Sequence, residues 1–300
     1  MQILSDAKHR RVARNRLVLV LGFMFICLLG CDATKEGTVA LDHDSVPPVP
    51  PVLPEKINRP AVLVFSKTNG YRHAEGIEAG LPAFEAIAER RGWGFYATEN
   101  GAVHNTELLD RFDAVVWFNV SGDVLSRDQK DALMEFTEAG GGFFGIHGTG
   151  GSPNTQWEDQ WKKLVGARFI GHPTGPALLE ATINVERPEH PVVQHLESEW
   201  VRTDEWYSFE RSVRGPGFEV LATVDESTYM PPIKPDGVDY RMGEDHPIIW
   251  THCVGKGRAL FSALGHRAED YAEPNHVQLL EEGVAWVAAG KAEGCQVGEN

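Results

Sequence analysis

Three of the twelve histidines come at or shortly after the ends of short apolar segments that are typical of buried strands. They are His73, His147 and His266. In an open α/β sheet, ligands bind at the carboxyl ends of the parallel strands, so we expect these side chains to line one pocket. Imidazole there can act as a general acid or base, bind a metal ion or hydrogen-bond a sugar. The alternative for each histidine taken alone is a hydrogen-bonded residue of the core.

The turn around His147 has the most distinctive local pattern. A strand ending in Gly145-Ile146-His147 runs into a glycine-rich stretch, residues 148–151. The order resembles the nucleophile elbow of α/β hydrolases and glutamine amidotransferases, in which glycines allow a tight turn that holds one side chain above the sheet. Here that side chain is imidazole, not a hydroxyl or thiol. The pattern therefore argues against serine-esterase or amidotransferase chemistry.

The middle of the chain supplies further candidates. Proline fixes a turn at Gly171-His172-Pro173, and Asp204-Glu205-Trp206-Tyr207 places two carboxylates beside two aromatic rings. Carboxylates with aromatic faces suit sugar rings, which present C–H faces and hydroxyl edges. The alternative is an acidic strand that is partly exposed, with its aromatic residues in the core. We interpret residues 189–191 as a turn, and we assign no function to five other histidines, His104, His195, His246, His252 and His276.

A divalent metal such as zinc is the second chemistry that these residues allow. Several imidazoles and a carboxylate can hold zinc with bonds of about 2.0–2.2 Å, and a catalytic site keeps one position open. The sequence contains neither His-Glu-x-x-His nor His-x-His spacing, so local spacing does not support a metal. Acid–base chemistry and metal binding both stay open at this point.

Alternating predicted strands and helices must position these residues. We expect strands at residues 61–66, 93–97, 113–120 and 143–147, with helices at 74–91 and from Ser126 to 139. The second half is rich in strands, expected at 177–186, 200–211, 218–224, 248–253 and 258–264, before a last helix at about 275–289. The predicted fold class is α/β, with a mostly parallel sheet, helices on both faces and an elaborated β-rich second half.

The first thirty residues predict export. Residues 8–16 are basic, residues 17–29 are apolar, and Leu28-Leu29-Gly30-Cys31 resembles the lipobox of bacterial lipoproteins. We expect a signal peptide at 1–30, a lipid anchor on Cys31 and a proline-rich linker at 31–59, on the periplasmic or cell-surface side. The alternative is an anchor helix that is not cleaved. For Cys253 and Cys295, a disulfide and two free thiols stay open.

The net charge of −15 excludes one class of partner. Binding to nucleic acid needs clustered Lys and Arg to neutralise phosphates, and the acidic body lacks such a cluster. The expected partners are therefore a small-molecule carbohydrate and, through the anchor, a membrane. The sequence leaves the oligomeric state open.

The chain resembles the ThuA-like (trehalose-utilisation) family from about residue 61 to 290. The resemblance rests on these stretches: Gly70-Tyr71-Arg72-His73, residues 141–147, Gly171-His172-Pro173, Glu189-His190-Pro191, Asp204-Glu205-Trp206-Tyr207, residues 247–250, residues 255–258 and Leu264-Gly265-His266. It implies a flavodoxin-like fold similar to class I glutamine amidotransferases, a domain at 60–291 with a tail at 292–300, and a role in sugar metabolism that includes trehalose and 3-keto-glycosides. Gly148-Thr149 departs from relatives, which more often carry Ala and a polar residue there.

Two functions follow from the motifs and the resemblance together. The first is an enzyme that acts on a sugar or a 3-keto-glycoside, either by histidine acid–base chemistry or through a metal. The second is a lipoprotein that binds or senses carbohydrate without catalysis. The expected catalytic residues are His147, His73 and Glu205, and the expected substrate-binding residues are His172, His266, Tyr207, Asp204 and Tyr71.

Overall fold

The fold is described from a computed structural model for residues 49–151, 158–229 and 239–296. All of them belong to one unit, which begins at Val46. The predicted signal peptide, Cys31 and residues 32–48 of the predicted linker lie outside the described residues, as does the end of the predicted tail. Among the helices that are described, none combines the length and the apolar character needed to cross a membrane.

A nine-stranded sheet forms the centre of this unit, in the order β2-β1-β3-β4-β11-β10-β9-β6-β7. The first five strands in this order are mutually parallel: β2 (Gly94–Thr98), β1 (Ala61–Phe65), β3 (Ala114–Phe118), β4 (Gly142–Ile146) and β11 (Gly257–Ser262). Every residue of β1, β3 and β4 is buried, as expected for parallel strands that are covered on both faces.

The second half of the sheet is antiparallel. It contains β10 (Pro247–Val254), β9 (Phe218–Val224), β6 (Leu178–Val185) and β7 (Glu199–Glu205). A separate pair, β5 (Phe169–Gly171) and β8 (Ser208–Phe209), lies beside it. The β-rich second half that the sequence predicts is therefore an extension of the main sheet.

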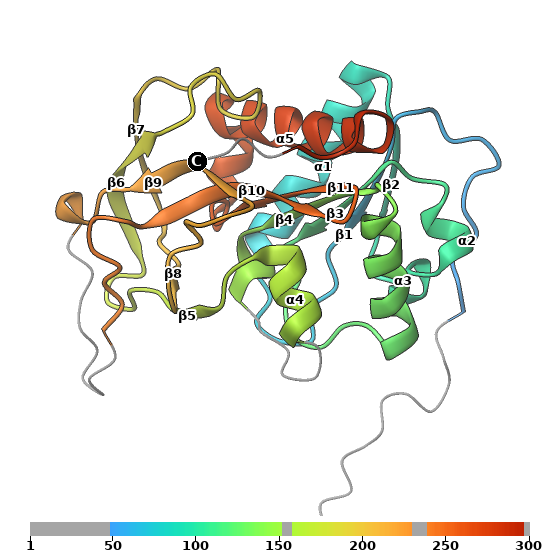
Figure 1. Cartoon of the computed structure of the whole chain (residues 1–300), viewed down its shortest axis with the longest axis horizontal. Coiled ribbons are helices and arrows are strands. Elements are labelled where there is room, and N and C mark those ends of the chain that lie inside the picture. Colours follow the sequence, from blue (N-terminus) through green and yellow to red (C-terminus); the bar gives the residue numbers. More distant parts are fainter. Residues whose placement is uncertain (1–48, 152–157, 230–238, 297–300) are drawn as a thin grey trace, which may run out of the picture. The chain divides into compact units, whose positions relative to one another are not determined.

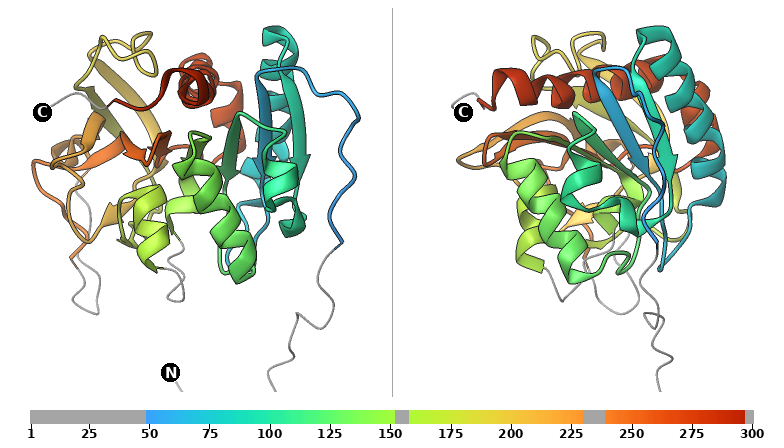
Figure 2. Two further views of the ribbon diagram at one scale, coloured as in Figure 1. Left: turned by 45° about the vertical axis from the view of Figure 1, so that its right-hand side comes forward. Right: turned by 90° about the vertical axis from the view of Figure 1, so that its right-hand side faces the viewer.

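Helices cover both faces of the sheet (Figures 1 and 2). One face carries α1 (Ala74–Arg91) and α5 (Pro274–Glu293), and the other carries α3 (Arg127–Glu138), α4 (Glu158–Val165) and the short α2 (Thr106–Leu109). Sequence signals explain two of these boundaries. Gly92 ends α1 in the left-handed conformation, and Ser126 begins α3 with a capping box. The predicted α/β class is confirmed.

One local prediction differs from the structure. Residues 200–211 were expected as one strand, but β7 ends at Glu205 and the chain turns through Trp206 and Tyr207 before β8. The Trp206 indole donates to the Leu179 carbonyl, so the aromatic pair packs inward at this turn. The predicted glycine-rich turn after β4 forms a short 3₁₀ helix, η2 (His147–Gly151).

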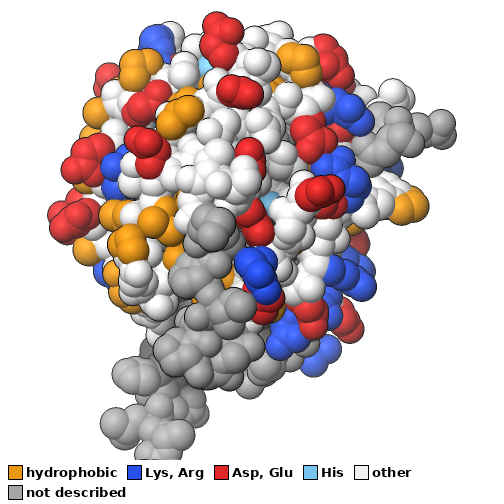
Figure 3. Space-filling model, turned by 90° about the vertical axis from the view of Figure 1, so that its left-hand side faces the viewer, with side chains coloured by type: hydrophobic (Ala, Val, Ile, Leu, Met, Phe, Trp, Pro, Cys, Tyr) orange, Lys and Arg blue, Asp and Glu red, His pale blue; other side chains and the backbone are white. Residues whose placement is uncertain are grey.

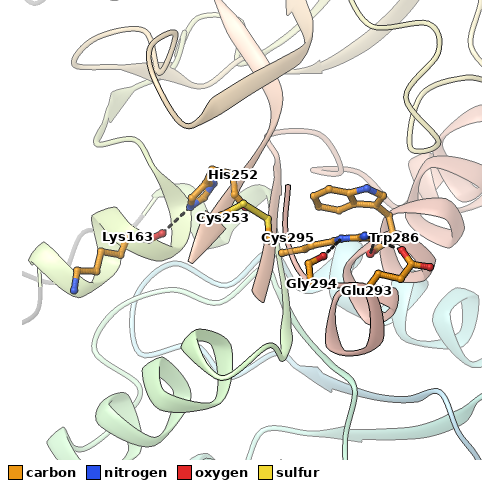
Figure 4. Close-up of a disulfide and its surroundings, with 8 residues drawn as sticks. Lys163, His252, Cys253, Trp286, Glu293, Gly294 and Cys295 are labelled. Carbon is orange, nitrogen blue, oxygen red and sulfur yellow. Dashed lines mark hydrogen bonds and ion pairs between the residues drawn. A yellow bond between two sulfur atoms is a disulfide. The ribbon is translucent and has the colours of Figure 1, made fainter. Parts of the chain in front are cut away.

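The two ends of the described chain are both attached to the domain. Residues 49–59 of the predicted linker pack along it, with Leu53 buried and the Arg59 guanidinium paired with Asp113. At the other end, Cys253 of β10 and Cys295 form a disulfide (Figure 4). Nearby, Arg258 donates to the carbonyls of Trp286 and Gly294. The predicted tail is thus held to the sheet as far as Cys295.

Candidate functional site

Four segments from distant parts of the chain deliver side chains to one point. His73 immediately precedes α1, His147 follows β4, His266 follows β11 and Glu205 ends β7. The three histidines come from the carboxyl ends of the parallel strands, which is where open α/β sheets bind ligands. Glu205 comes from β7, which is the outermost strand of the antiparallel half of the sheet.

The polar atoms of these four side chains are close enough to interact with one another. His266 Nδ1 lies 3.1 Å from His147 Nε2 and 3.1 Å from Glu205 Oε2. Glu205 Oε2 is 3.5 Å from His147 Nε2 and 3.9 Å from His73 Nε2. One potential ligand atom from each residue lies within 4.8 Å of all the others. We call these residues, His73, His147, Glu205 and His266, the His–Glu cluster.

The backbone at His147 is shaped to aim its ring at the cluster. His147 has a φ of 43°, an uncommon left-handed conformation for a residue with a side chain. Its Nδ1 donates to the Ala263 carbonyl at 2.7 Å, so Nε2 faces the cluster. A Cβ on the next residue, Gly148, would stand only 2.9 Å from His73 Nδ1. Glycine at 148 therefore lets His73 approach.

Polar contacts to β3 hold the same turn. The Asn119 side chain accepts from Gly148 N at 3.0 Å. The Thr149 hydroxyl donates to the Trp117 carbonyl at 2.7 Å and accepts from Val120 N at 3.2 Å. Thr149 thus ties the turn to the end of a neighbouring strand.

Asp204 faces away from the cluster and organises the backbone around it. It is fully buried and accepts from the backbone N–H groups of Glu205 at 2.9 Å, Gly265 at 3.0 Å and His266 at 3.3 Å. Arg202 donates to its carboxylate at 2.9 Å. Burial would raise the pKa of Asp204. The charges of Arg202 and His147, together with hydrogen bonds from the backbone N–H groups, outweigh it and lower that pKa below its usual value. The structure therefore places Asp204 behind the site instead of on its open side.

The side chains of the His–Glu cluster have pKa values that are shifted in different directions. Burial would raise the pKa of Glu205, but hydrogen bonds with His147, His266 and His73 outweigh it and hold that pKa well below its usual range. Burial lowers the pKa of His73 to about 4. For His266, burial would lower the pKa, but the hydrogen bond and charge of Glu205, with Asp204 and Asp270, raise it. At neutral pH the site thus holds an ionised Glu205 beside a neutral His73.

The other predicted site residues surround the cluster. His172 Nδ1 lies 3.1 Å from Glu205 Oε1, and the Tyr207 ring packs 4.4 Å from the His147 ring. Tyr207 is buried, and burial raises the pKa of its hydroxyl well above the usual value. Tyr71 is 71% exposed, with its ring 4.8 Å from that of His73.

The side chains of His172 and His266 are 28% and 22% exposed, whereas that of Glu205 is 6% exposed. The cluster is therefore reached from the side of Tyr71, His172 and His266. Figure 3 shows the side of the unit formed by β6, β7 and β9, where histidines appear only as small patches.

Three residues behind the site were not found from the sequence. Arg202 pairs with Asp270 at 2.8 Å as well as with Asp204, and its Nη1 lies 3.2 Å from His276 Nδ1. Arg202 and Asp204 are two residues apart in β7 and so share a face, which is the one signal that could have linked them. Nothing in the sequence pattern points to Asp270 or His276, because their place depends on how the 3₁₀ helix η5 (Ala268–Ala272) and α5 pack against the sheet.

Comparison with known proteins gives a family and a fold. The model of the ThuA family, described as trehalose utilisation, matches residues 61–287. A solved ThuA-like protein from Bacteroides uniformis is 24% identical with a TM-score of 0.66, covering 79% of this chain and 94% of that one. A second, from Parabacteroides merdae, is 18% identical with a TM-score of 0.51, covering 77% and 90%. At these identities, the likeness shows the fold alone. No curated protein matches the chain.

Proposed function

Because the chain belongs to the ThuA family, we propose that it is an enzyme that acts on a sugar or a 3-keto-glycoside at the His–Glu cluster. The observation that carries the proposal is the convergence of three imidazoles on one buried carboxylate at the carboxyl edge of the sheet. The family's description as trehalose utilisation supports a sugar as the substrate.

In this proposal, the position and charge of each residue determine its role. Glu205 is an ionised acceptor, and His73 is a neutral imidazole that can take a proton from a substrate hydroxyl. His147 is held by Ala263 with Nε2 toward the same point. His172 and His266 line the exposed side, where they can hydrogen-bond sugar hydroxyls. Tyr71 offers an exposed ring for the C–H face of a sugar.

A turnover assay on a sugar panel tests this proposal. The panel contains trehalose, related disaccharides and their 3-keto derivatives, and the proteins are wild type, His147→Ala, Glu205→Gln and the control His195→Gln. Loss of a general acid or base typically costs about 10²–10⁴ in rate, so both site variants should lose activity by that order. His195 Nε2 donates to the Asn275 carbonyl at 2.9 Å and is not a member of the His–Glu cluster, so its variant should keep wild-type turnover.

Two outcomes would contradict the proposal. Full activity in a folded His147→Ala protein would remove His147 from the mechanism. Saturable sugar binding by wild type, without turnover of any panel member, would instead favour the carbohydrate-binding alternative. Far-UV circular dichroism of each variant separates loss of chemistry from loss of fold.

We also propose that the protein is exported and anchored to a membrane through lipid on Cys31, on the periplasmic or cell-surface side. The support is the order of basic segment, apolar segment and Leu28-Leu29-Gly30-Cys31. One acyl chain binds membranes only marginally, so stable anchoring requires more than one chain.

A further inference from the structure

We propose that His73, His147, Glu205 and His266 bind a divalent transition-metal ion of the zinc type. This proposal rests on the proposed function, because it assigns the chemistry of the same site. Metal binding can nevertheless be measured without a substrate. Within the described residues, this is the one group of three or more histidine, cysteine and carboxylate side chains whose ligand atoms converge.

The spacing of the polar atoms matches a tetrahedral ion. Bonds of about 2.1 Å from zinc to nitrogen and oxygen place the corners of a tetrahedron about 3.4 Å apart. Three of the separations in the cluster are 3.1, 3.1 and 3.5 Å, and the distance from His73 Nε2 to Glu205 is 3.9 Å. The atoms of His147, Glu205 and His266 thus already have nearly tetrahedral spacing, while separations in the whole cluster extend to 4.8 Å, so His73 has to move closer to share the ion.

The hydrogen bonding inside the cluster leaves lone pairs that a cation can take up. Because Nδ1 of His147 donates to Ala263, the neutral form of His147 has its lone pair on Nε2. That lone pair and Glu205 Oε2 both face His266 Nδ1, which carries at most one proton. Two acceptors therefore compete for one donor. A single cation at the centre satisfies all of these lone pairs at once.

The surroundings of the cluster are those of a metal site. Ligating histidines usually donate their second N–H to a carbonyl or carboxylate, and ligating carboxylates are themselves hydrogen-bonded. His147 donates to Ala263, and the second oxygen of Glu205 lies at an ion-pair distance of 3.1 Å from His172 Nδ1, which also faces the Pro173 carbonyl at 2.8 Å. Asp204 fixes the backbone of both Glu205 and His266. Two ligands are thus positioned by one buried carboxylate.

His73 differs from the other three residues. Its Nε2 lies farther from Glu205 Oε2, at 3.9 Å, than the ligand atoms of His147 and His266 do, and among the described residues its Nδ1 has no hydrogen-bond partner. It also lies beside the exposed Tyr71. We expect His73 to be the weakest ligand, on the side from which a water or a substrate oxygen reaches the ion. Three imidazoles and one carboxylate favour zinc and its neighbours over Mg²⁺ and Ca²⁺, which prefer all-oxygen sites.

Metal titration tests the site directly. The full chain is purified in detergent, stripped with a chelator and titrated with ZnSO₄ and MgSO₄ by isothermal calorimetry, with metal content measured after gel filtration. Wild type should bind one zinc per chain and show a higher Tm with zinc, while magnesium gives no heat. His147→Ala and Glu205→Gln should weaken zinc binding at least 100-fold, His73→Ala less, and His195→Gln not at all.

The results separate the metal from the proposed enzyme activity. Failure of folded wild type to bind stoichiometric zinc would overturn the metal site, and so would equal zinc affinity in Glu205→Gln, which keeps the size of the side chain. Sugar turnover by the metal-free protein would then leave the enzyme proposal standing. Stoichiometric zinc binding without turnover, with any first-row metal added, would leave the metal site standing and overturn the enzyme proposal.

Discussion

Asp204 and Glu205 are neighbours in the chain, but they have opposite tasks. Successive side chains of a strand point to opposite faces, so the end of β7 directs one carboxylate into the cluster and the other into the protein. Glu205 meets four imidazoles, whereas Asp204 meets Arg202 and three backbone N–H groups. A sequence pattern shows the pair but not which member faces the site.

The first residue-scale prediction concerns Asp204→Asn. The amide keeps the shape but replaces one acceptor oxygen with a donor facing Arg202 or the backbone of Gly265. A buried group left without a partner costs about 1–3 kcal/mol, so the free energy of unfolding should fall by that amount. Because the backbone of two proposed ligands moves, zinc affinity should fall about 10–100-fold.

Urea denaturation and zinc calorimetry measure these two effects separately. Asp239→Asn is the matched control, because Asp239 is exposed and pairs with Arg241, and neither belongs to the His–Glu cluster. A lower stability of Asp204→Asn with unchanged zinc affinity would show that Asp204 stabilises the fold without positioning the ligands.

The candidate site was partly predictable at this scale. The rule that ligands bind at the carboxyl ends of parallel strands linked His73, His147 and His266, and the structure brings their rings within 4.6–5.2 Å of one another. Residue type indicated Glu205, but its distance to the histidines depends on where the antiparallel half of the sheet places the end of β7. Arg202, Asp270 and His276 are joined only by tertiary packing, which no local pattern reports.

At the scale of elements, prediction succeeded where a local signal ends an element. The bounds of α1 and β9 agree with the expected residues 74–91 and 218–224. The error at residues 200–211 arose because Trp206 and Tyr207 have high strand propensity, while long-range packing turns the chain there. Tertiary contacts thus outweighed intrinsic preference at the place where the strand delivers Glu205.

The element-scale prediction concerns the Cys253–Cys295 disulfide, which holds the end of α5 to β10. Cys253 pairs in register with Arg258 near the start of β11, whereas His266 follows the other end of that strand. A cross-link across 42 residues restricts the unfolded chain and stabilises the fold by roughly 4 kcal/mol in the chain-entropy model. Cys295→Ala should lower the free energy of unfolding by about 2–4 kcal/mol and leave zinc affinity unchanged.

Urea unfolding with and without reductant checks this prediction. Reductant should destabilise wild type by the same amount as the substitution and should have no effect on Cys295→Ala. Unequal effects of reductant and substitution would mean that the cysteine side chain contributes through packing instead of through the cross-link.

At the scale of the whole molecule, charge and cysteine use favour one environment. The chain has 43 acidic and 28 basic residues, and five of the basic residues lie before the apolar segment at 17–29. Disulfides persist in oxidising compartments and are rare in the cytosol, so the Cys253–Cys295 bond supports the proposed export. This support is independent of the lipobox, because it comes from the other end of the chain.

The whole-molecule prediction concerns Cys31, which lies outside the described residues. If Cys31 carries the lipid, Cys31→Ala should abolish metabolic labelling with palmitate and block cleavage before residue 31. The variant should then migrate as the longer precursor on a denaturing gel. Cys27→Ala is the matched control, because Cys27 lies inside the apolar segment and should be removed with the signal.

Labelling, gel mobility and membrane fractionation of the two variants decide between the alternatives for the first thirty residues. A cleaved lipoprotein loses label in Cys31→Ala and keeps it in Cys27→Ala. An uncleaved anchor helix has the same mobility and the same membrane fraction in wild type and in both variants, because its attachment depends on the apolar run and not on a thiol. Label retained in Cys31→Ala would overturn the lipid anchor, while the His–Glu cluster, which lies wholly within the domain, would still be tested by its own metal titration.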